Sequence, residues 1–115
     1  MDFVDKHVLF ETQYNQLTEI IDEIAERIRM LGFEAPASLT EFSKLTTLNE
    51  LSGQERNSKS FIEALVADHE SVIQYIRPLI NSFAEDFDDA GTSDYITSLI
   101  QIHEKMTWFL KAHIS

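Results

Sequence analysis

The chain has 115 residues, a length that accommodates one domain of ordinary size. Its 9 basic and 20 acidic residues give a formal charge of −11, while 43% of the residues are hydrophobic, so the chain should fold despite that charge. These figures exclude a multidomain enzyme and disfavour a bare nucleic-acid-binding surface; the absence of cysteine excludes a disulfide framework or a thiolate metal site.

The first predicted element is a long helix that ends before Gly32. Only 3 Gly and 2 Pro occur in the whole chain, which favours a few long helices. Apolar residues recur at alternating steps of four and three, as on the buried seam of a helix in a bundle. This seam consists of Phe10, Tyr14, Leu17, Ile21, Ile24, Ile28 and Leu31. Gly32 is the expected C-cap of this helix.

The connection over residues 36–53 twice contains a capping signature, Ser or Thr followed three residues later by Glu, and this predicts a short helix there. The signatures are Ser38 with Glu41 and Thr47 with Glu50. A second long helix is predicted to open at Ser60, which forms a capping box with Glu63, and Pro78 is expected to kink it. Its apolar seam consists of Ile62, Leu65, His69, Val72, Ile76, Leu79 and Phe83.

The last predicted helix opens near Thr92 or Ser93, just after Gly91. Its apolar face consists of Ile96, Leu99, His103, Met106 and Leu110. Strand-like alternation is nowhere sustained, so we expect an all-α bundle of three long helices and a short crossover helix, forming one domain over residues 1–115.

No segment approaches the roughly 20 apolar residues of a membrane span. The N-terminus also lacks a basic stretch followed by an apolar run, which is the pattern of a secretory signal. We therefore expect a soluble protein of the reducing cytoplasm, with no membrane partner.

Four potential metal ligands form a stripe along the first predicted helix. His7 and Glu11 are four residues apart, as are Asp22 and Glu26, so each pair points toward one place. All four lie within an arc of about 100°, but a rise of ~1.5 Å per residue separates His7 from Asp22 by about 22 Å. One chain cannot gather them around one ion. Two copies packed antiparallel about a two-fold axis would place one chain's His7 and Glu11 against the partner's Asp22 and Glu26.

Imidazole with carboxylate oxygens suits iron(II), manganese or zinc better than copper(I), which prefers sulfur ligands. The residues alone also permit a solvated helix face without a metal. In that alternative Glu26 pairs with Arg29 or with Lys6 of a partner.

The run Asp22–Ile28, followed by Leu31 and Gly32, resembles the signature of the Dps family of miniferritins, and the resemblance covers essentially the whole chain. Upstream, His7 and the pairs Phe10-Glu11 and Gln13-Tyr14 fall at the family's spacing. Downstream, the segments Asp68-His69-Glu70, Gly91–Asp94 and Lys105–Phe109 resemble family segments in the same order. Thr107 is a departure, because the family usually has an apolar residue there.

The resemblance implies a ferritin-like fold, a dodecameric shell built from dimer pairs, and oxidation of iron(II), typically by hydrogen peroxide, before storage of the ferric mineral. It implies ligands His7 and Glu11 facing the partner's Asp22 and Glu26, with Glu11 at a position that is often Asp. Other divalent metals are alternative occupants.

The family has a further long helix before the residues that match Met1, and it carries another His ligand. We expect this chain to lack that helix, either because it is truncated or because its partners fill the gap. Four of the usual five ligands then remain. The competing hypothesis is a helical assembly or interaction module that has lost ferroxidase activity.

The remaining polar residues carry weaker signals. His69 and His103 are predicted to be buried core imidazoles, and the absence of a Glu-x-x-His pair argues against a di-iron site inside one bundle. Asp94 resembles acidic residues that line the family's ion pores, and its alternative role is an acid near a helix N-terminus. DNA binding is not expected, because the chain is strongly acidic and has no Lys-rich tail.

Overall fold

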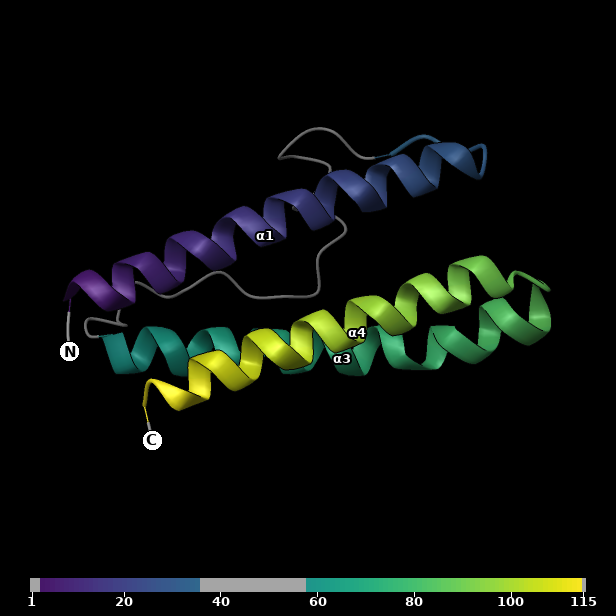
Figure 1. The fold of residues 1–115 in the computed structure, drawn as a ribbon. Coiled ribbons are helices and arrows are strands. Elements are labelled where there is room, and N and C mark those ends of the chain that lie inside the picture. Colours follow the sequence, from purple (N-terminus) through teal and green to yellow (C-terminus); the bar gives the residue numbers. More distant parts are fainter. Residues whose placement is uncertain (1–2, 36–57, 115) are drawn as a thin grey trace. The chain divides into compact units, whose positions relative to one another are not determined.

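A computed structural model of the protein describes residues 3–35 and 58–114. In chain order it contains α1 (Phe3–Met30), α3 (Ser58–Asn81), the short π-helix η1 (Ser82–Asp86) and α4 (Ala90–Ala112) (Figure 1). No strand occurs within these ranges, which confirms the all-α prediction. The predicted short helix over 36–53 lies outside the described residues. The chain forms two compact units, Met1–Asn49 with α1 and Glu50–Ser115 with α3 and α4.

The end of α1 confirms the predicted cap. Gly32 has a φ of 95°, in the left-handed region that a residue with a Cβ rarely adopts. Its N–H donates to the carbonyl of Arg29 at 3.0 Å, and the N–H of Phe33 donates to the carbonyl of Ile28 at 3.1 Å. These two bonds form a Schellman motif, which satisfies carbonyls at the helix end.

The predicted seam of α1 is only partly buried. Ile20 and Gln13 are only 7% and 6% exposed to solvent, whereas Tyr14 and Ile21 are 70% and 56% exposed. The seam prediction is therefore wrong for Tyr14 and Ile21 in the single chain. The buried face is rotated away from these two residues, toward Gln13 and Ile20. Leu31, just beyond the end of α1, is 43% exposed, so the seam prediction is wrong there as well.

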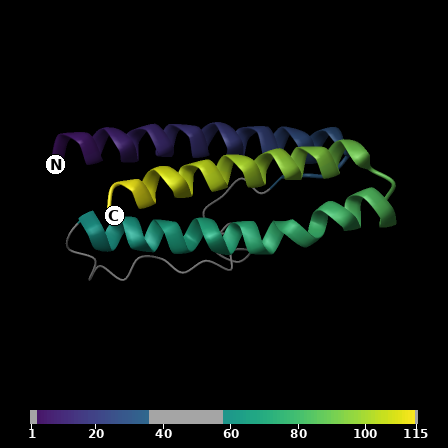
Figure 2. The same ribbon diagram turned by 60° about the horizontal axis from the view of Figure 1, so that its bottom comes forward.

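The helices α3 and α4 lie side by side and run antiparallel, with a short turn between η1 and α4 (Figures 1 and 2). Their core is a cluster of Ile73 from α3 with Ile96 and Ile100 from α4. The residues packed against this cluster are Ile76, Leu79, Ile80 and Phe83. All five residues of the predicted apolar face of α4 are buried, which confirms that face.

Both α3 and α4 begin about two residues before their predicted starts. α3 begins at Ser58 rather than Ser60, and α4 begins at Ala90. Asp89 caps α4, because its carboxylate accepts from the N–H of Thr92 at 3.0 Å and from the Thr92 hydroxyl at 2.6 Å. The prediction that α4 opens near Thr92 is therefore wrong, since an acid two residues before Gly91 serves as the cap.

Pro78 lies inside α3, which continues for three more residues. The α3 ribbon bends toward its C-terminal end, as expected where a proline removes a hydrogen-bond donor from a helix (Figure 2). Beyond it, the N–H of Phe87 donates to the carbonyl of Ser82 at 3.2 Å, five residues back, which is the π-helical pattern. Asp88 then adopts a φ of 50° and turns the chain toward α4.

Replacing Ile100 by Ala should destabilise the fold by about 2–5 kcal/mol, because the substitution opens a cavity in the α3–α4 core. Ile100 retains only 4% of its exposed surface. Chemical denaturation measures the loss. The matched control is its exposed neighbour Gln101→Ala, which should change the free energy of unfolding by less than about 0.5 kcal/mol. Equal losses in both variants would contradict this core.

Candidate metal centre

His7 and Glu11 form the first half of the stripe, one turn apart on α1. Nε2 of His7 lies 3.9 Å from Oε2 of Glu11, and the two side chains are 68% and 65% exposed. This separation is too long for a hydrogen bond. An imidazole nitrogen and a carboxylate oxygen therefore point into one solvent-facing region, as the spacing predicts.

Asp22 and Glu26 form the second half, and both are exposed on the same uninterrupted helix. Since α1 has no break between His7 and Asp22, the helical rise sets about 22 Å between the two halves. Within the part of one chain that the structure describes, no three His, Asp or Glu side chains gather where they could hold an ion. A single chain thus places His7 near Glu11, and Asp22 about one helical turn from Glu26, but it does not gather all four residues.

The stripe points away from the buried side of α1. On a helical wheel at 100° per residue, Gln13 and Ile20 lie about 180° from the centre of the stripe. Among residues 7–30 of α1, whose burial the structure describes, these are the two buried residues, at 6% and 7% exposure. The ligand face is therefore the face that α1 presents to solvent.

The spacing of the four ligands along α1 is symmetric about one point, so the pair His7 and Glu11 and the pair Asp22 and Glu26 can be exchanged by a two-fold axis. The midpoint between His7 and Glu26 coincides with the midpoint between Glu11 and Asp22, and it falls between residues 16 and 17. A two-fold axis through this point sets a second α1 antiparallel to the first. Each His7 then lies opposite a Glu26, and each Glu11 lies opposite an Asp22, at both ends simultaneously.

Large apolar side chains border this stripe and remain exposed. Val8, Tyr14 and Ile21 are 56%, 70% and 56% exposed. On the helical wheel Tyr14 and Ile21 flank one edge of the stripe, and Val8 lies at the other edge. Apolar surface between and beside polar groups is typical of a face that a partner covers.

His69 and His103 are buried core imidazoles, which confirms the prediction. Their Nδ1 atoms lie 2.8 Å apart, so the two rings are hydrogen-bonded to each other across α3 and α4. Burial is the main cause that lowers the pKa of both rings. This bond was not predictable from the sequence, because it depends on the register of two antiparallel helices. Thr107 is buried nearby, and its hydroxyl donates to the carbonyl of His103 at 2.8 Å, which accommodates a polar side chain at this apolar position.

Asp94 is exposed in the second turn of α4. Because Asp89 is the N-cap, Asp94 lies beyond the first turn, where the favourable effect of the helix dipole on an acid has largely faded. The helix-end explanation of Asp94 therefore weakens. Its assignment to a pore stays a prediction.

No helix in residues 3–35 or 58–114 is both long and apolar enough to cross a membrane.

A family model described as a ferritin-like domain matches residues 1–115. An uncharacterized low temperature-induced protein of Nostoc is 38% identical over 112 residues, which are 97% of this chain and 63% of that protein. A DNA protection during starvation protein of Agrobacterium fabrum is 33% identical over 115 residues, covering 97% of this chain and 68% of that protein.

A crystal structure of a Dps protein from Bacillus brevis matches the fold with a TM-score of 0.89 at 25% identity. The match covers 98% of this chain and 74% of that one, whereas the chain spans less than two thirds of the Nostoc relative. The fold, the family model and the relatives agree with the motif resemblance. The chain belongs to the Dps-type miniferritins of the ferritin-like family.

Proposed function

We propose that the chain is an iron-oxidising and iron-storing subunit whose ferroxidase centre is shared between two copies. One observation carries this proposal: two exposed ligand pairs on one face of α1, about 22 Å apart, are related by a single midpoint. A second α1 can complete both sites simultaneously. Membership of the Dps-type family supports iron as the substrate rather than manganese or zinc.

In each shared centre, His7 and Glu11 of one chain and the partner's Asp22 and Glu26 bind iron(II). Three carboxylates and one imidazole stabilise the additional positive charge that iron acquires on oxidation. Two iron(II) ions each give one electron, and together they reduce one hydrogen peroxide to water, with protons drawn from solvent. The protein contributes position and negative charge.

The same proposal extends to the whole assembly. Residues 1–115 form one ferritin-like domain, copies pair through the stripe face of α1, and the pairs build a dodecameric shell in the cytoplasm. Asp94 lines an ion pore, and the charge of −11 attracts iron(II) toward the shell. DNA is not a partner of this acidic chain.

Light scattering and an iron(II) oxidation assay on the same sample test the proposal. We expect an assembly well above the 13.3 kDa of one chain, and an absorbance rise from ferric product when iron(II) and peroxide are added. Assembly without oxidation above the protein-free background would favour the alternative, a helical assembly module. A 13.3 kDa species in solution would contradict both functions.

A further inference from the structure

His69 on α3 and His103 on α4 form a buried polar contact at the centre of an apolar seam. The two residues retain 5% and 7% of their exposed surface, and their ring centroids are 5.0 Å apart. The Nδ1–Nδ1 distance of 2.8 Å requires a hydrogen bond, so one ring donates its Nδ1–H to the lone pair on the other. The neutral pair therefore consists of two different tautomers.

At low pH the pair can bind two further protons, one on each ring. A first added proton can enter at Nε2 of the donor ring, which keeps the hydrogen bond but places a charge in the core. A second proton can enter only at Nδ1 of the acceptor ring, because its Nε2 already carries hydrogen. That step removes the hydrogen bond and sets two like charges 2.8 Å apart.

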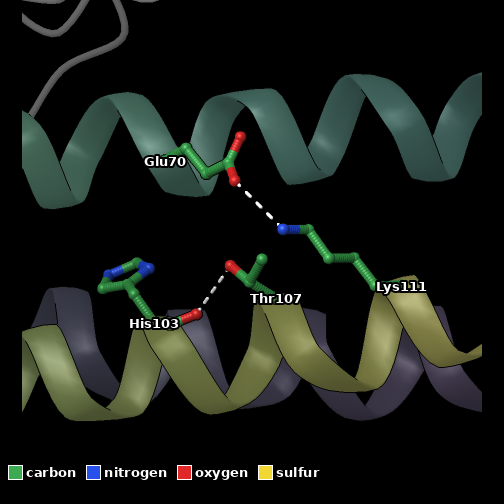
Figure 3. A network of polar contacts seen from close by, with 4 residues as sticks. All are labelled: Glu70, His103, Thr107 and Lys111. Carbon is green, nitrogen blue, oxygen red and sulfur yellow. Dashed lines mark hydrogen bonds and ion pairs between the residues drawn. The ribbon is translucent and has the colours of Figure 1, made fainter.

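The charged groups near the pair lie toward solvent. Ion pairs join the two helices through Glu70 and Lys111, at 3.2 Å, and through Arg77 and Glu104, at 3.6 Å, and all four side chains are about half exposed or more. Figure 3 shows Lys111 reaching Glu70, while the Thr107 hydroxyl points at the backbone carbonyl of His103 rather than at its ring.

Asp68, beside His69, is a carboxyl whose own pKa is raised by burial. In the described part of the chain, no carboxylate hydrogen-bonds to either imidazole. Residues 3–35 and 58–114 therefore provide no hydrogen-bonded anion that would stabilise an imidazolium at either ring.

We propose that the His69–His103 pair is an acid-sensitive joint between α3 and α4, which holds the two helices while both rings are neutral and loosens them when the rings are protonated. The proposal is independent of the iron chemistry, since neither ring belongs to the stripe on α1. It concerns the stability of the subunit on which any assembly depends.

The direction of the pH dependence follows from the proton affinities. Burial first, and then the charge of His103, lowers the pKa of His69 from its ordinary 6.5 to about 4. Between pH 6.5 and 4 the unfolded chain therefore binds more protons than the folded chain, and stability falls as the pH falls. His69 alone should lower the folding equilibrium constant by about 20-fold between pH 7 and pH 5. His103, whose pKa burial also lowers, adds to the loss.

Denaturant unfolding of the full chain at pH 7 and pH 5 tests the joint. The double variant H69L/H103L removes both imidazoles, so its folding equilibrium constant should fall at least about 10-fold less than that of the wild type between these pH values. His113→Gln is the matched control, because it removes an imidazole that lies outside the joint. That imidazole contacts the Phe109 carbonyl near the end of α4. This variant should keep the wild-type pH dependence. An equal acid loss in the double variant and the wild type would overturn the proposal.

Nitrogen NMR of the imidazoles in the wild-type protein provides a test that does not depend on a variant folding. At pH 6 we expect two neutral rings, one protonated at Nδ1 and the other at Nε2. Two imidazoles at positions 69 and 103 that titrate near 6.5, as in a solvated peptide, would overturn the proposal.

Discussion

The double substitution Asp22→Asn with Glu26→Gln should lower the rate of iron(II) oxidation by more than about 10-fold, since loss of even an outer-shell partner of a metal site commonly costs 10–100-fold. The amides preserve the shape of both side chains but remove the negative charge that binds iron. Both residues are exposed on an uninterrupted helix, so α1 should form normally. Stopped-flow absorbance after mixing iron(II) with peroxide gives the rate, and circular dichroism checks that the helices are retained.

The matched control is Glu23→Gln, which removes a carboxylate beside Asp22. Glu23 is exposed on α1 but lies about 60° outside the stripe on the helical wheel. This variant should oxidise iron(II) at nearly the wild-type rate. If it lost as much activity as the double variant, general electrostatic attraction rather than ligation would explain the effect. If neither variant lost activity, Asp22 and Glu26 would not be ligands.

Local periodicity predicted most of the fold, and α4 is the clearest case. The steps between Ile96 and Leu110 follow the 3.6-residue period, and every predicted core position of that helix is buried. Boundaries were less accurate, because Asp89 rather than Thr92 or Ser93 caps α4. The π-helix after α3 was not predicted, since its five-residue hydrogen-bond step has no apolar signature in the sequence.

Tyr14 and Ile21 show that periodicity does not reveal which surface an apolar residue contacts. Their spacing places them on the apolar seam of α1, yet they are exposed in the single chain. An apolar residue contacts either the chain's own core or another subunit, and the 3.6-residue period is the same in both cases. Their position beside the stripe is consistent with the second role.

For the polar residues too, contacts within one helix were predictable from the sequence, whereas contacts between helices or between chains were not. The spacing along one helix predicted that His7 approaches Glu11, and the structure places their polar atoms 3.9 Å apart. The contact between His69 and His103 was not predictable, because the two residues are 34 positions apart in sequence and meet only through the register of α3 against α4. The pairing of two α1 helices depends on the assembly of two chains, which neither the sequence pattern nor the single chain determines. It stays a prediction of symmetry.

Mixing two complementary inactive variants should restore iron(II) oxidation if two α1 helices pair as proposed. One chain carries His7→Gln with Glu11→Gln, and the other carries Asp22→Asn with Glu26→Gln, so neither variant alone can form an intact centre. When the two are mixed in equal amounts and reassembled, half of the dimers contain one chain of each kind. Every such dimer has one centre in which all four ligands are native and one in which all four are replaced. Oxidation should therefore reappear only after mixing.

The rate of iron(II) oxidation in this mixed assembly is the most direct measurement of whether two chains share one centre. Random pairing predicts recovery to about one quarter of the wild-type rate, from parents that show almost none. Native mass spectrometry of the same sample establishes that mixed dimers are present. If mixed dimers form and the rate stays at the level of the parents, the ligands do not meet across two copies of α1, and the proposed centre is wrong.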